Sequence, residues 1–178
     1  MHVTAKKMAF CGLMLAFTIV CIALGSIIET NTLFLLAASS YFVGIVVRET
    51  GPGMGAAFYL AGVFLGFIVS PNKLYVLSYG AMGLYILLNE LFYRWIGRMK
   101  SNVNRKAVFW GVKYIIFNLM YLPMLFGFQK LLFGSGLTEK MLLLFAAAGQ
   151  VGFFLYDRAY EYVQGHVWNR LRGKMGLM

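Results

Sequence analysis

Six long apolar segments divide this chain, and they constrain its fold more than any other feature. They lie at residues 8–28, 33–47, 54–69, 74–93, 107–128 and 141–157. A helix needs about 20 mainly apolar residues to cross the hydrocarbon core of a bilayer, and such a helix satisfies its own backbone hydrogen bonds there. We therefore predict an all-α polytopic membrane protein: a single domain, a six-helix bundle, with an amphipathic C-terminal extension over residues 158–174.

The composition supports this prediction and excludes both a disordered chain and a soluble globular protein. Hydrophobic residues make up 61% of the chain and charged residues only 12%, against about 45–50% and about 25% in ordinary soluble domains. Disordered chains need low hydrophobicity and a high charge density. A soluble globule could not cover so much apolar surface with so few charges.

The basic residues predict the orientation of the six segments, because Lys and Arg concentrate on the cytoplasmic side of membrane proteins. With both termini in the cytoplasm, the outer side holds Lys73, Lys130 and Lys140, and Lys113 lies inside the fifth segment. The inner side then holds the other twelve of the 16 basic residues: Lys6, Lys7, Arg48, Arg94, Arg98, Lys100, Arg105, Lys106, Arg158, Arg170, Arg172 and Lys174. The net charge of +10 therefore indicates topology and contact with the lipid bilayer, not nucleic-acid binding.

Small residues four positions apart mark places where membrane helices can approach closely. Gly12 and Ala16 form such a pair in the first segment, and Gly62 and Gly66 form a GxxxG pair in the third. Two interpretations stay open for each pair. It can pack inside the bundle, or it can form a docking face for another membrane protein.

Three ionisable residues lie within the apolar segments, where charges are costly and often functional. They are Glu90, Lys113 and Asp157. Antiparallel threading places all three at a similar depth, so we predict a charge cluster in which Lys113 bridges Glu90 or Asp157. Such a cluster can be structural, or it can serve coupling, transport or membrane-embedded catalysis.

Polar and aromatic side chains gather toward the predicted outer half, and they are candidates for binding a small molecule. An amide near the midplane can bond a neighbouring helix or a ligand, and tyrosines at this depth can form an ordinary interfacial belt or a ligand cup. The candidate ligand-binding residues are Asn31, Asn72, Tyr75, Tyr79, Asn118, Tyr121 and Gln150.

The common catalytic signatures are missing from the sequence. No G-x-x-x-x-G-K-[ST], H-E-x-x-H or G-x-S-x-G stretch occurs. His2 and His166 lie at opposite ends of the chain. We therefore expect no metal site, no cofactor and no enzymatic activity.

Two stretches of the chain carry a family resemblance. Residues 4–16 place two lysines before Gly12 and Ala16, and residues 51–57 read Gly-Pro-Gly-Met-Gly-Ala-Ala. Together with six short segments in 178 residues, they resemble the substrate-binding S component of an energy-coupling factor (ECF) transporter. In many members an Ala-xxx-Ala pair near the N-terminus packs against the coupling protein, and Gly12 replaces its first alanine here. A Gly-Pro-x-x-Gly-Ala turn starts the third helix in many members.

The resemblance implies a high-affinity binding subunit for uptake of a small nutrient, a vitamin or its precursor, in the plasma membrane of a prokaryote. It also implies a transmembrane coupling protein and paired ATPases as partners, and a ligand held in the outer half, among helices four to six and the external loops. The alternative is a structural or regulatory multi-pass protein that assembles with other membrane proteins and binds no solute.

Overall fold

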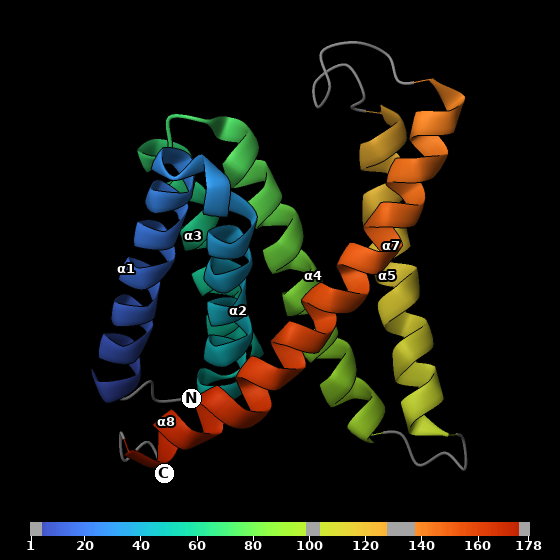
Figure 1. Cartoon of the computed structure of the whole chain (residues 1–178). Coiled ribbons are helices and arrows are strands. Elements are labelled where there is room, and N and C mark those ends of the chain that lie inside the picture. The colour runs from blue at the N-terminus through green and yellow to red at the C-terminus, as the bar shows by residue number, and fades with distance from the viewer. Residues whose placement is uncertain (1–4, 99–103, 128–137, 175–178) are drawn as a thin grey trace. The chain divides into compact units, whose positions relative to one another are not determined.

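The structure, a computed structural model, describes residues 5–98, 104–127 and 138–174. These residues form helices and connecting turns, with no strand among them. Six helices are long and apolar enough to cross a membrane, and they divide between two compact units, Met1–Lys100 and Ser101–Met178 (Figure 1). An all-α multi-pass membrane protein is thereby confirmed. The orientation of the termini and the grouping of all six helices in one domain stay predictions.

Unit 1 contains four of the long helices: α1 (Ala5–Ile27), α2 (Thr32–Thr50), α3 (Pro52–Val69) and α4 (Lys73–Arg98), with a 3-10 turn at Glu29–Asn31. Helix α2 is central, because it packs against each of the other three and is the most buried of the four. Its two buried serine hydroxyls donate hydrogen bonds to carbonyls of the same helix. Ser39 and Ser40 donate to the carbonyls of Leu36 and Ala37, at 2.7 and 2.6 Å, as serines commonly do inside membrane helices.

A tight turn brings α3 back along α2. Gly51 has φ = 104°, a left-handed conformation that residues other than glycine rarely adopt, and Pro52 supplies the first residue of α3. Four residues after the turn starts, a Cβ atom at Gly55 would collide with Val47. Glycine is therefore required twice, once to turn the chain and once to let α3 lie close against α2.

Unit 2 consists of α5 (Arg105–Gly127), α7 (Glu139–Tyr162), a π-helix η2 (Val163–Trp168) and α8 (Asn169–Lys174). Helices α5 and α7 are antiparallel neighbours. Phe117 stacks on Phe153 with ring centroids 4.3 Å apart. Tyr114 meets the same Phe153 ring edge-on at 5.8 Å. Aromatic packing thus joins the two helices along their middle.

The helices extend beyond the predicted apolar segments, mostly at ends that carry charge. Helix α4 runs to Arg98, where apolarity alone indicated an end near residue 93. The final segment, predicted at 141–157, is part of a helical stretch from Glu139 that continues through η2 and α8 to Lys174. Hydropathy marks the part of a helix that lies in hydrocarbon, whereas a helix can continue into water with charged residues on it.

Candidate functional site

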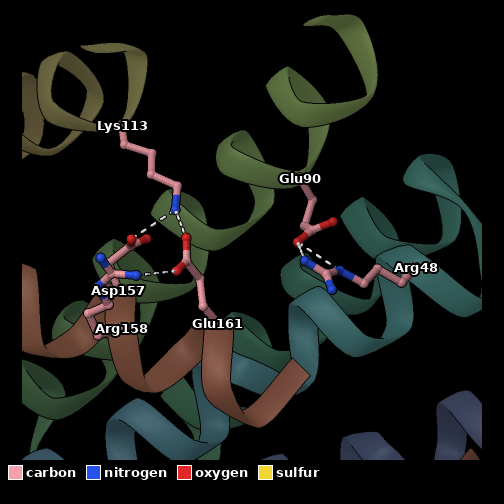
Figure 2. A network of polar contacts seen from close by, with 6 residues as sticks. All are labelled: Arg48, Glu90, Lys113, Asp157, Arg158 and Glu161. Atoms are coloured by element: carbon pink, nitrogen blue, oxygen red, sulfur yellow. Dashed lines mark hydrogen bonds and ion pairs between the residues drawn. The ribbon is translucent and has the colours of Figure 1, made fainter. Parts of the chain in front are cut away.

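Unit 2 holds a four-residue charge network between α5 and α7 (Figure 2). The Lys113 ammonium donates to Asp157 Oδ2 and to Glu161 Oε1, each at 2.8 Å. Arg158 donates to the other oxygen of Glu161 at 3.2 Å. The side chains of Lys113 and Asp157 are 1% and 0% exposed, while Glu161 and Arg158 are 40% and 57% exposed. Two positive and two negative charges therefore balance, with the Lys113–Asp157 pair at the buried end.

Aromatic rings surround the cations of this network. The Lys113 ammonium lies 4.6 Å from the Phe109 ring centroid and 5.5 Å from that of Trp110. The Arg158 guanidinium lies over Trp110 and Phe154, at 5.6 and 5.5 Å. Rings supply a negative π face to a cation without adding another charge. The network is thus stabilised by ion pairs in its centre and by cation–π contacts around it.

Unit 1 contains a second ion pair, between α2 and α4 (Figure 2). Arg48 donates through Nε and Nη2 to Glu90 Oε1, at 2.9 and 2.5 Å. Glu90 is 3% exposed and Arg48 is 39% exposed. One turn further along α4, Arg94 donates to the carbonyl of Val47 at 2.6 Å. These contacts close the C-terminal end of α2, where carbonyls lack partners within the helix.

The structure decides part of the predicted charge cluster. Of the two partners left open for Lys113, it pairs Lys113 with Asp157. Glu90 pairs with Arg48 inside unit 1. Arg48 and Glu161, which the sequence pattern did not single out, are also members of these networks. Arg48 ends the second apolar segment at the same predicted side as Glu90, so matching depths could have found that pair.

The candidate amides and tyrosine of unit 2 are engaged in helix packing. Gln150 Nε2 donates to Asn118 Oδ1 at 2.8 Å, and the Tyr121 hydroxyl donates to the carbonyl of Phe145 at 2.7 Å. A Cβ atom at Gly149 would collide with the Tyr121 ring. Of the two roles considered for these residues, the geometry shows the helix–helix contact. Gln150 Oε1 is buried and has no hydrogen-bond partner in the described part of the chain.

Of the candidate ligand residues of unit 1, Asn72, Tyr75 and Tyr79 lie at the start of α4, and Asn31 lies at the start of α2. Asn31 and Asn72 are exposed, and Tyr75 is half-buried. Asn72 Oδ1 accepts from the backbone nitrogen of Leu74 at 3.0 Å and so starts the helix. Tyr79 is 0% exposed, and its hydroxyl finds no hydrogen-bond partner among the residues that the structure describes. Such an unsatisfied buried hydroxyl is uncommon, so Tyr79 is the most distinctive residue of the set.

The two pairs of small residues have different surroundings. Gly62 and Gly66 are buried. A Cβ atom at Gly62 would collide with the Tyr79 hydroxyl, and one at Gly66 would lie 3.2 Å from Ile22. These two glycines therefore serve packing within unit 1, which is the first of the two interpretations left open for them, and the described residues give no sign of the docking face. Gly12 and Ala16 are exposed, and a Cβ atom at Gly12 would meet no atom within 4 Å.

Neither charge network has the composition of a metal site. No group of three or more His, Cys, Asp and Glu side chains suited to a metal ion occurs in residues 5–98, 104–127 and 138–174. Each buried carboxylate faces a cation of its own unit. This arrangement neutralises the buried carboxylates within the membrane.

Comparisons of the chain with protein-family models, with curated proteins and with solved structures found no match. Functional inference therefore depends on the residues of the chain and on their geometry.

Proposed function

We propose that this chain is the substrate-binding subunit of a nutrient uptake system in the plasma membrane of a prokaryote. It binds a small nutrient, a vitamin or its precursor, with high affinity from the outer side. A separate transmembrane coupling protein and paired ATPases supply the energy. The six apolar helices and the resemblance of residues 4–16 and 51–57 to ECF S components support this assignment.

The exposed pair on α1 is the observation that carries the proposal. Helix α1 buries one face in unit 1, through Phe10, Met14 and Thr18. Gly12 and Ala16 lie on the exposed side of the same turns. In lipid, close approach of two helices requires small residues, because bulk apolarity gives no drive to associate. Gly12 and Ala16 thus give the exposed side of α1 a narrow strip of small residues, beside the exposed side chains of Leu13 and Phe17, where a helix of a coupling protein can approach closely.

Copurification from membranes that contain the coupling protein and its ATPases tests the docking role. The variant Gly12→Leu plus Ala16→Leu is expected to lose the partners while remaining folded, since neither added side chain enters the core of unit 1. The matched control is Ala148→Leu plus Gly152→Leu, the same change at an exposed pair on α7. Unchanged partner recovery for the α1 variant contradicts the docking role. Equal losses for both variants contradict it as well, because the effect would not be specific to α1.

Tyr79 offers a test of the ligand role. Its hydroxyl has no protein partner in the described residues, and a ligand or a water molecule that reaches it would supply one. Thermal unfolding of the purified chain in detergent, with and without a panel of vitamins and precursors, is expected to show stabilisation by one ligand class, because binding to the folded state raises its stability. Stabilisation by none of the compounds contradicts the binding role.

The alternative function, assembly with other membrane proteins without solute binding, is favoured by a different observation. Asn118, Tyr121 and Gln150 already make contacts between α5 and α7, so they are not held ready for a solute. An exposed small pair on α1 suits this alternative equally. Partner copurification without any ligand-dependent stabilisation would favour it over the uptake role.

A further inference from the structure

The last helical stretch is too long for the bilayer. Helices α7, η2 and α8 follow one another without a break over 36 residues, from Glu139 to Lys174. At about 1.5 Å per residue the stretch is roughly 50 Å long, against a hydrocarbon core of about 30 Å. A tilt of about 40°, the upper end of the range for membrane helices, uses only some 26 residues to cross it. Counted from Met141, where the apolar part begins, the helix therefore leaves the hydrocarbon within η2 or before it.

The pairing of α5 with α7 places the charge network toward the same end of the two helices. Across the antiparallel pair, Asn118 meets Gln150, and Lys113 meets Asp157 and Glu161. Arg105, the first residue of α5, lies about two turns beyond Lys113, and basic residues at a helix end mark the membrane surface. Residues after Glu161 thus continue past the charge network toward that surface.

The segment Gly165–Lys174 has the side-chain pattern of a helix that lies on a membrane surface. It contains no acidic residue and carries Arg170, Arg172 and Lys174. Val167 and Leu171 are one turn apart and remain 44% and 45% exposed. Arg170 and Arg172 are exposed and project about 100° to either side of Leu171. An apolar ridge with cations on both flanks can enter the headgroup layer while its guanidinium groups reach phosphates.

The junction with the membrane-spanning part is a π-helix. Helix η2 covers Val163–Trp168 and has Gly165 at its centre. Runs of π-helix are rare and frequently occur at functional sites. In η2 the change of helix type falls where the chain leaves the hydrocarbon, so it separates the spanning part from the amphipathic segment.

We propose that Gly165–Lys174 is a surface-binding segment for anionic lipid headgroups, at the membrane face where α7 emerges. The partner is the phosphate layer of an acidic bilayer, because the segment offers only positive charge and a narrow apolar ridge. A ridge of two aliphatic side chains binds weakly by itself, so anionic lipid supplies the second signal. This proposal requires the membrane-spanning fold and does not depend on the nutrient-binding role.

A nitroxide spin label at residue 173 tests the proposal on the full chain. The label is introduced as Gly173→Cys with Cys11→Ala and Cys21→Ala, since a Cβ atom at Gly173 meets no atom within 4 Å. The protein is placed in nanodiscs of phosphatidylglycerol or of phosphatidylcholine. Accessibility of the label to oxygen and to a water-soluble nickel chelate then reports its depth. A membrane-surface depth is expected in phosphatidylglycerol, and a water-exposed position is expected in phosphatidylcholine or at high salt.

Charge variants complete the test. Arg170→Gln plus Arg172→Gln is expected to shift the equilibrium toward the water-exposed position by about 30-fold, because each basic residue near an anionic surface contributes about a factor of five. Lys6→Gln plus Lys7→Gln removes the same charge from the start of α1 and is expected to leave the label depth unchanged. A water-exposed label in both lipids overturns the proposal. A label equally immobilised in both lipids also overturns it, since contact with protein would then hold the segment.

Discussion

Replacing Lys113 with methionine is expected to destabilise the folded protein by about 3 kcal/mol. The substitution keeps an unbranched side chain of nearly the same length and removes its charge. It takes an ammonium away from Asp157 and Glu161, at 2.8 Å from each. Removing one partner of a buried ion pair typically costs about 3–5 kcal/mol. We use the lower end because Glu161 is 40% exposed and water can solvate it.

The network predicts an order of effects among three further variants. Asp157→Asn is expected to cost less than Lys113→Met, because Lys113 keeps Glu161 and its ring contact with Phe109. Lys113→Met combined with Asp157→Leu is expected to cost less than Lys113→Met alone, since no buried charge loses its partner. Arg158→Gln breaks the exposed pair with Glu161 and the exposed cation–π contacts with Trp110 and Phe154, and it is expected to cost about 1 kcal/mol.

Unfolding in mixed micelles of mild detergent and sodium dodecyl sulfate, followed by circular dichroism, measures these differences. A loss of about 3 kcal/mol lowers the ratio of folded to unfolded protein more than a hundredfold, which this titration resolves. A cost for Lys113→Met below about 1 kcal/mol would refute the reasoning, because the pair would then be solvated. A Lys113→Met plus Asp157→Leu variant that loses the sum of the separate Lys113→Met and Asp157→Leu losses would refute the coupling between Lys113 and Asp157.

Four further variants are followed in the same unfolding titration. Gly62→Val is expected to destabilise the protein by about 1–3 kcal/mol, because the valine side chain would collide with Tyr79. Gly12→Val lies on an open face and should change stability by less than about 0.5 kcal/mol. Equal effects of the two substitutions would contradict the packing described. Tyr79→Phe should leave stability within about 0.5 kcal/mol of the parent, since no hydrogen-bond partner in the described residues loses a bond. A larger loss would show that the Tyr79 hydroxyl does have a hydrogen-bond partner. Glu90→Gln should cost about 1.5–3 kcal/mol by weakening the bonds from Arg48, and an unchanged midpoint would show that the pair is solvated.

The positions of the six membrane helices could be predicted from the sequence because hydropathy acts over long windows and needs no knowledge of neighbours. The ends of the helices were harder to predict from the sequence. Helix α4 continues from residue 93 to Arg98, since a helix does not stop where the hydrocarbon stops. The π-helix at Val163–Trp168 has no signal in hydropathy at all.

Which residues contact each other could not be predicted from the sequence, because it depends on the three-dimensional packing of the helices. The GxxxG spacing of Gly62 and Gly66 and the related spacing of Gly12 and Ala16 look equivalent in the sequence. Only the structure shows that Tyr79 fills the space beside Gly62 while the space beside Gly12 is open. Similarly, Lys113 had two possible carboxylate partners at a matching depth. The packing of α5 against α7 within unit 2, which sequence periodicity does not encode, brings Lys113 to Asp157.

Mass spectrometry of the chain purified natively from membranes tests the central claim most directly. The extracted small molecules are compared with those from a matched preparation of the Tyr79→Trp variant, which removes the Tyr79 hydroxyl and whose larger ring is expected to disturb the packing against Gly62. The uptake role predicts one small nutrient or precursor in near-equimolar amount with the parent protein, reduced in the variant, and able to stabilise the ligand-free chain when added back. Absence of any copurified small molecule, together with no stabilisation by the vitamin panel, would contradict the claim.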